Sequence, residues 1–551
     1  MTETGDRNDG GVPREPELVH YRGGRIFTAN EPAWAESLLV RGDTIEFAGD
    51  TGTADTLAAG ARVVDLDGAF VLPGFVDAHT HLLSLGESLR QVDLFDATDL
   101  AEIQARIGAA AAADPSAPRI LGRSWLFGAL AGRAPDRHLI DAVVADRPVY
   151  LTANDHHSAW VNSAALRELG IGQDTPDPVG GRIGRDAANE PDGMLYESAA
   201  LGLLRRFLDG TVRDAERDTA LAAAFERYLA DGVTTVVDMA SGPEDLGALE
   251  RAVERGGGRL PLRVAAHWLV ERTGRPEDEL AQVAKAAELS RRLAGPWLRV
   301  TGIKVMVDGV IDSCTAAMKE PFADGSHPGP IWDLDALAPV VAAADAAGLQ
   351  VAMHAIGDEA SDIALSALEH AIAVNGPRDR RHRIEHLETV TEENVRRLAK
   401  LGVVASMQPV HADPAIQDNW RAMLGDDRAL RGYPWPEFTA AGAVVAFGSD
   451  APTAPHPPLP NMFVATTRRS AVDPRLAPNV PDYALPLADA LAHGTRHAAY
   501  SCRAEHHTGR LAAGFAADFV VLDQDPFAEG LDALLRTRVR STFVAGETAT
   551  A

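Results

Sequence analysis

The feature that most limits the fold of this 551-residue chain is a series of short apolar segments that alternate with helical stretches. The alternation is regular from about residue 215 onward, and one more apolar segment precedes it. Parallel strands need long crossover connections, which are usually helices, so eight such segments predict a (β/α)8 barrel of the TIM type. Residues 214–230 and 391–400 have the helical period and end near Gly232 and Gly402. The eight expected strands are residues 71–79, 233–238, 262–267, 300–307, 349–354, 383–386, 403–408 and 444–448.

Both ends of the chain carry short strand signals outside the barrel. A few short strands cannot bury enough surface alone, so each end needs a partner. We therefore expect residues 17–70 and 508–551 to form one composite β-sandwich beside a barrel of residues 71–507, after a disordered leader of residues 1–16. The strand signals are residues 25–27, 38–40, 44–47, 518–522 and 541–544, with a hairpin-like turn at Arg41-Gly42-Asp43.

A long interval after the first barrel strand breaks the alternation. It contains loops rich in proline and glycine at residues 174–193 and one apolar strand at residues 148–151. We interpret residues 90–215 as an insertion subdomain within the barrel.

The composition is that of an ordinary folded protein, with 46% hydrophobic and 24% charged residues. A net charge of −27 argues against nucleic-acid or anionic-membrane partners, since both attract cationic surfaces. Two cysteines give no disulfide framework, and no apolar run approaches the length of about 18 residues that a membrane span requires. We expect a cytoplasmic protein that acts on a small molecule, with a homodimer as an open alternative to a monomer.

The apolar run at residues 71–82 ends in His79-Thr80-His81. Side chains on a strand alternate between faces, so His79 and His81 would project to one side. Imidazole is the commonest protein ligand for a transition metal. In a chain with 18 histidines the tripeptide alone is as well explained by chance. Its position at the C-terminal end of a barrel strand favours a metal site, because the chemistry of such barrels sits there.

Four more polar residues lie within or at the ends of later strands: Lys304, His354, His386 and Asp450. Each has an ordinary interpretation by itself, as a paired lysine, a hydrogen-bonded core histidine or a helix N-cap. Their order along the chain is more informative, with lysine on the fourth strand, histidine on the fifth and sixth, and aspartate on the eighth. We predict that they converge with the His-x-His pair on one mouth of the barrel.

At these positions the sequence resembles the amidohydrolase superfamily, whose members carry this ligand set on a distorted TIM barrel with a β-sandwich built from both chain ends. It is most similar to the YtcJ-like branch, which includes N-substituted formamide deformylase. Two residues depart from that pattern, His156 where glycine is usual and Cys314 where arginine is frequent, in segments expected to contact substrate. The motifs that carry the resemblance are residues 73–81, 157–163 with Ala165 and Leu166, Lys304 with 308–309, 354–358, 382–386, 408–409 and 448–450.

The resemblance implies a metal-dependent hydrolase with one or two divalent ions, and zinc is the metal we expect. A carbamate on Lys304 would bridge the two ions. Asp450 would accept the proton of the attacking water and pass it to the departing nitrogen. The implied ligands are His79, His81 and Asp450 for one ion and His354 with His386 for the other.

Two further histidines, His157 and His411, are candidates to stabilise the developing oxyanion, although each also fits an ordinary loop position. The expected reaction is hydrolysis of a carbon–nitrogen bond in a non-peptide amide, an N-formyl group or a cyclic amide. One alternative is an aromatic deaminase with a single metal, which needs no bridging lysine, so Lys304 weighs against it. Another is a scaffold without activity, against which the complete ligand set weighs.

Overall fold

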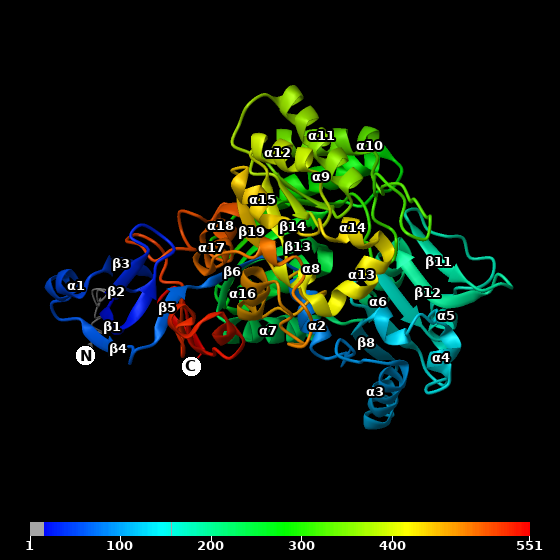
Figure 1. The fold of residues 1–551 in the computed structure, drawn as a ribbon, viewed down its shortest axis with the longest axis horizontal. Coiled ribbons are helices and arrows are strands. Elements are labelled where there is room, and N and C mark those ends of the chain that lie inside the picture. Colours follow the sequence, from blue (N-terminus) through cyan, green and yellow to red (C-terminus); the bar gives the residue numbers. More distant parts are fainter. Residues whose placement is uncertain (1–15, 156, 551) are drawn as a thin grey trace, which may run out of the picture.

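The computed structural model describes residues 16–155 and 157–550. Apart from Pro16, the leader expected over residues 1–16 lies outside this range, as does His156. Figure 1 shows three parts side by side: a sheet that contains both ends of the chain, a central barrel, and a subdomain on the opposite side of the barrel.

The central part is a sheet of eight parallel strands in chain order, which confirms the (β/α)8 fold class. The sheet is nearly closed, because a parallel bridge joins Thr80, the last residue of the first strand, to Ala451, which lies beyond the end of the last strand. The strands are β6 (Phe75–Thr80), β13 (Val233–Ser241), β14 (Arg263–Leu269), β15 (Leu298–Met306), β16 (Gln350–Ala355), β17 (Arg383–His386), β18 (Val404–Met407) and β19 (Val445–Phe447).

Helices surround this barrel and share one hydrophobic core with its strands. The helix expected over residues 214–230 is α7 (Asp214–Ala230), and the one expected over residues 391–400 is α12 (Glu392–Lys400), whose N-cap is Thr391. The other barrel helices are α8 (Pro243–Arg255), α9 (Pro276–Arg292), α10 (Leu334–Ala346), α11 (Asp358–Asn375), α13 (Gln417–Leu424), α14 (Asp426–Ala429), α15 (Trp435–Ala440), α16 (Pro458–Thr467), α17 (Leu487–His493) and α18 (Arg496–Ser501).

The strand expected over residues 71–79 is two strands that belong to different sheets. β5 (Phe70–Pro73) pairs with the terminal sheet, and β6 pairs with β13 of the barrel. Gly74 separates them at a point of close contact, where an added Cβ would lie 2.3 Å from the Thr234 side chain. The barrel therefore begins at Phe75 rather than at residue 71.

The two ends of the chain contribute to one hydrogen-bonded sheet, in the order β22-β21-β20-β5-β1-β2-β3, with β4 paired to β1. Its strands pack around a core in which the rings of Phe519 and Phe543 stack at 4.2 Å and Tyr21 meets Phe519 edge-on at 5.2 Å. Its strands other than β5 are β1 (Leu18–Phe27), β2 (Trp34–Arg41), β3 (Thr44–Gly49), β4 (Arg62–Asp65), β20 (Phe519–Leu522), β21 (Val539–Val544) and β22 (Glu547–Thr550), with α1 (Thr51–Leu57) and α19 (Pro526–Glu529) beside them.

The insertion contains a six-stranded sheet of its own, in the order β11-β12-β10-β9-β8-β7, of which only β9 was expected. Trp125 and Trp160 are fully buried in its separate core. The insertion joins the barrel through α2 (Leu82–Ser88) and α6 (Arg205–Asp209). Its other elements are β7 (Val92–Asp93), α3 (Leu100–Ala113), β8 (Ile120–Trp125), α4 (Arg137–Asp141), β9 (Val149–Ala153), β10 (Ser158–Val161), α5 (Ser163–Leu169), β11 (Gly181–Arg185), β12 (Pro191–Glu197) and a π-helical segment (Ser198–Leu204).

Among the residues that the structure describes, no helix combines the length and the hydropathy that crossing a membrane would require.

Candidate metal centre

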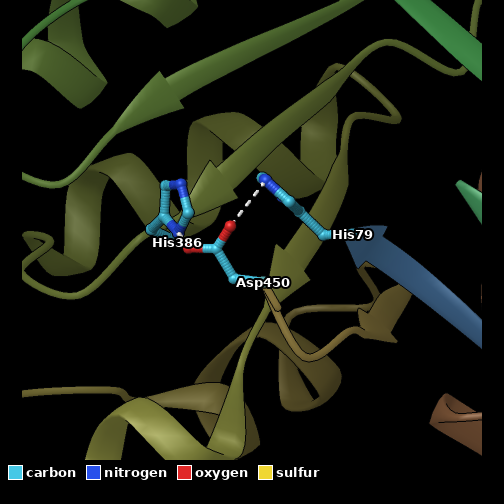
Figure 2. Close-up of side chains that lie close together, drawn as sticks. All are labelled: His79, His386 and Asp450. Atoms are coloured by element: carbon cyan, nitrogen blue, oxygen red, sulfur yellow. Dashed lines mark ion pairs between the residues drawn. The ribbon is translucent and has the colours of Figure 1, made fainter. Parts of the chain in front are cut away.

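His79 on β6 and His81, one residue beyond the end of that strand, meet the carboxylate of Asp450. Asp450 Oδ1 lies 3.2 Å from His79 Nε2 and 3.1 Å from His81 Nε2. His79 is fully buried, whereas the His81 side chain is 23% exposed. Figure 2 shows His79 and His386 pointing toward Asp450 from two sides. The alternation of β6 therefore directs both imidazoles to the mouth of the barrel.

Asp450 reaches this position because the chain after β19 runs close against β6. Asp450 N donates to His79 O at 2.7 Å, and Ser449 N donates to Asp77 Oδ1 at 2.9 Å. Gly448 permits the approach, since an added Cβ would lie 2.4 Å from His79 N. Asp450 itself has a φ of 60°, a left-handed conformation that non-glycine residues adopt only at some cost.

His386 ends β17 and turns toward the same point. Its ring centroid lies 4.9 Å from that of His79, and its Nδ1 lies 3.9 Å from Asp450 Oδ2. His386 and Leu387 both have positive φ values, 73° and 50°, so the chain turns sharply where the strand ends. Ligand atoms of His79, His386 and Asp450 all lie within 4.8 Å of one another, a spacing that one metal ion could span.

Lys304 and His354 line the same cavity as these residues. Lys304 Nζ lies 3.4 Å from His79 Nε2, and the side chain is buried on β15. Burial lowers the pKa of Lys304 to about 8, although Glu385 and Asp450 oppose this shift. The His354 ring lies 4.5 Å from that of His386, and its Nε2 lies 3.0 Å from the Gly309 carbonyl oxygen. The six predicted ligands thus share one cavity of about 760 Å³.

The hydrogen bonds of these histidines suit a cation. His79 Nδ1 donates to Glu385 Oε2 at 2.7 Å, and His81 Nδ1 donates to the Met239 carbonyl oxygen at 2.8 Å. Both acceptors require the proton on Nδ1, so in the neutral rings the Nε2 lone pairs face the Asp450 carboxylate. Burial also lowers the pKa of His81 and so favours its neutral form. A cation between the carboxylate and these lone pairs would stabilise the arrangement. The set of imidazole and carboxylate donors suits a divalent transition metal.

Behind His79 lies a buried ion pair that the sequence did not reveal. Glu385 accepts from Arg383 Nε at 2.5 Å, and Arg383 also donates to the Ala78 carbonyl oxygen at 2.6 Å. This network ties β17 to β6 and holds His79 in one tautomer. The sequence signals for Glu385 are its position next to His386 and its place in the motif of residues 382–386 that carries the resemblance.

The two expected oxyanion stabilisers also line the cavity. His157 Nδ1 donates to Glu197 Oε2 at 2.7 Å, and His411 Nδ1 lies 3.4 Å from Glu388 Oε1. Burial alone would lower the pKa of His157, but Glu197 raises it to about 9. Cys314, one of the two departures from the family pattern, contacts Met423 through its sulfur at 3.1 Å.

A parallel barrel with these histidines, a lysine and an aspartate at its mouth is the architecture of metal-dependent hydrolases of the amidohydrolase family. The sequence profile described as the amidohydrolase family matches residues 62–549, so the chain belongs to this family.

Particular relatives cover nearly the whole chain. The chain is 32% identical to Protein LONG AFTER FAR-RED 3 of Arabidopsis thaliana (95% of this chain, 90% of that protein) and 31% identical to the putative amidohydrolase YtcJ of Bacillus subtilis (96% and 98%). It is 28% identical to N-substituted formamide deformylase of Arthrobacter pascens (93% and 94%). The crystal structure of an uncharacterised metal-dependent hydrolase from Pyrococcus furiosus is similar with a TM-score of 0.71 at 29% identity, over 92% of this chain and 99% of that one.

Proposed function

We propose that this protein hydrolyses a carbon–nitrogen bond in a small non-peptide amide, N-formyl compound or cyclic amide, with one or two divalent ions, zinc being the metal expected. The observation that carries the proposal is the convergence of His79, His386 and Asp450 within 4.8 Å in a deep cavity. The similarity to a formamide deformylase supports the choice of bond.

The residues around Asp450 fit one ion held by His79, His81 and Asp450, and His354 with His386 are suited to a second. A bound divalent ion lowers the pKa of water to about 7 and polarises a substrate carbonyl. Asp450 is placed to orient the attacking water and to accept its proton. Burial lowers the pKa of His354 and His386 well below the usual value, so both stay neutral, as metal ligands must.

Lys304 has a specific part in this proposal. Its lowered pKa leaves a share of the amine uncharged near neutral pH, and an uncharged amine can react with CO2 to form a carbamate. Its Nζ lies 3.4 Å from His79 Nε2, so a carbamate there would extend an anionic oxygen toward the proposed ligands. A deaminase with a single metal has no use for such a group, which weighs against that alternative.

The experiment is elemental analysis of the purified protein together with assays on a panel of N-formyl and N-acyl amines. We expect about one or two divalent ions per chain, loss of activity after chelation, and recovery on adding metal. Asp450→Asn keeps the shape of the side chain but cannot accept the proton, and it should lose roughly 10²-fold or more in kcat. Failure of the metal-loaded protein on the whole panel would contradict the proposed function.

A further inference from the structure

Two histidines beside the proposed metal site are built alike. His157 is held through Nδ1 by Glu197, and His411 through Nδ1 by Glu388. All four side chains line the cavity, and each residue is less than 10% exposed. In each dyad the carboxylate faces Nδ1 and stabilises the imidazolium form of the ring, in which Nε2 also carries a proton and can donate it to whatever enters the cavity.

We infer that the two dyads act on different parts of the substrate. His411, positioned by Glu388, protonates the leaving nitrogen in place of the direct transfer from Asp450 that the resemblance implies. His157, positioned by Glu197, donates a hydrogen bond to the carbonyl oxygen. This inference rests on the proposed function, because it assigns roles within amide hydrolysis.

The position of His411 points to the leaving group. Its ring lies parallel to that of His386 at 5.9 Å, and its Nε2 lies 3.7 Å from Asp450 Oδ2. Among the described residues this buried Nε2 has no hydrogen-bond partner. A buried polar atom without a partner costs about 1–3 kcal/mol, so its presence beside the cavity indicates that a ligand supplies the partner. Its proximity to Asp450 connects it to the group that collects the proton of water.

Glu388 is fixed on every side, which suits a positioning residue. Its Oε2 accepts from Trp420 Nε1 at 2.9 Å and from Tyr433 Oη at 3.1 Å. Its carbonyl oxygen also accepts from Tyr433 N at 2.9 Å. A carboxylate held by these donors cannot follow His411 if the ring moves, so it restricts Nε2 to one direction.

The second dyad fastens the insertion to the barrel. Glu197 Oε1 accepts from Thr315 Oγ1 at 2.5 Å, and Glu197 N donates to the His157 carbonyl oxygen at 2.7 Å. Glu197 has φ 50° and ψ −123°, a conformation that costs a non-glycine residue about 1–3 kcal/mol and is typical of functional sites. The His157 ring lies 5.1 Å from that of His354, beside the second proposed ligand group. This position suits the carbonyl side of the substrate.

The steps balance without a further reactant. The oxygen of water bonds to the carbonyl carbon as Asp450 takes one of its protons, and His157 donates a hydrogen bond to the carbonyl oxygen. The carbon–nitrogen bond then breaks as the Nε2 proton of His411 moves to the nitrogen, which leaves as an amine. Asp450 finally returns its proton to His411, so one water is consumed and each residue regains its starting state.

The test is a series of N-alkylformamides and substituted formanilides whose leaving amines differ in basicity. A strongly basic amine must be protonated before it can leave, whereas 4-nitroaniline can leave with little help from a proton. His411→Gln should therefore lower kcat/KM by about 10²–10³-fold for the alkylformamides and by less than about tenfold for 4-nitroformanilide. Glu388→Gln should follow the same dependence on the leaving group, because it acts through His411.

His157→Gln should instead cost about 10²-fold for every member of the series, as expected for one lost oxyanion donor. It should also weaken the binding of a phosphonate analogue of the tetrahedral state, measured by calorimetry, by a similar factor. His138→Gln is the matched control, since its side chain is 66% exposed on the insertion, and we expect wild-type kinetics. Metal content and melting temperature are measured for every variant.

The outcomes distinguish a failure of the proposed function from a failure of the role given to His411. A wild-type enzyme that is inert on the whole series contradicts the proposed function. An active wild type with a His411→Gln variant that loses the same factor on every substrate contradicts the role of His411. Loss of metal from that variant also contradicts it, because His411 would then be a ligand.

Discussion

The residues of the proposed metal site differ in how far they could be predicted. The six expected ligands could be predicted because each lies within or near the end of a predicted barrel strand, and because their order along the chain is informative. The glutamates that orient the histidines gave no such signal. They are two of 79 acidic residues: Glu197 is the last residue of β12, and Glu388 lies two residues after β17. Only the folded chain brings them to His157 and His411.

Lys304 provides a test at this scale. Lys304→Ala should remove the proposed carbamate, reduce the bound metal by about one ion per chain, and lower kcat/KM by at least about 10²-fold, because the anion proposed to bridge the two ions would be lost. The measurements are elemental analysis and kinetics with and without added bicarbonate. A single-metal enzyme would keep its metal content and activity in this variant, and a scaffold would be hardly affected; either result would contradict the binuclear proposal.

The barrel elements were predicted closely where the pattern was strong, and less well where strands were short. The period of residues 214–230 gave the bounds of α7, and the eight parallel strands were all anticipated. Five strands of the insertion were missed, since β7 has only two residues and β11 and β12 mix glycine and charged residues with apolar ones. The division of residues 71–79 depends on the contact between Gly74 and Thr234, which no local pattern encodes.

The junction between β6 and β19 gives a prediction at the scale of elements. In Gly448→Ala the new Cβ would lie 2.4 Å from His79 N and 2.9 Å from His79 Cβ, so either the segment after β19 or the end of β6 must shift. We expect a loss of about 1–3 kcal/mol in stability and weaker metal binding, because Asp450 and His79 shift together. Thermal unfolding and metal titration measure the two effects. Gly442→Ala is no suitable control because its φ is 87°, whereas Gly329→Ala has open space and should behave as wild type.

At the scale of the whole molecule, a buried ion pair joins the barrel to the terminal sheet. Arg263 Nε on β14 donates at 2.8 Å to Asp518, which also accepts from Ala545 N at 2.7 Å. The joint origin of the terminal sheet from both chain ends was anticipated from strand signals too short to stand alone. The ion pair between Arg263 and Asp518 could not be predicted, because neither residue lies in a recognisable motif.

Arg263→Met should destabilise the protein by about 3–5 kcal/mol, because it leaves the Asp518 carboxylate buried without its cation. The double variant Arg263→Met with Asp518→Asn should recover a large part of that loss. The measurement is the melting temperature at a fixed scan rate, in the presence of metal. Equal melting temperatures for the wild type and Arg263→Met would show that the pair does not hold the two parts together.

The split at Gly74 bears on the order in which the molecule can be completed. β5 leads through Gly74 into β6, which carries His79 and ends just before His81, yet the neighbour of β5 on one side is β20, some 450 positions later in the chain. During synthesis this pairing can form only after about 450 further residues have been made. Contacts so distant along the chain form slowly. Ion capture should accordingly be a late event in the folding of this protein, after β20 has been made.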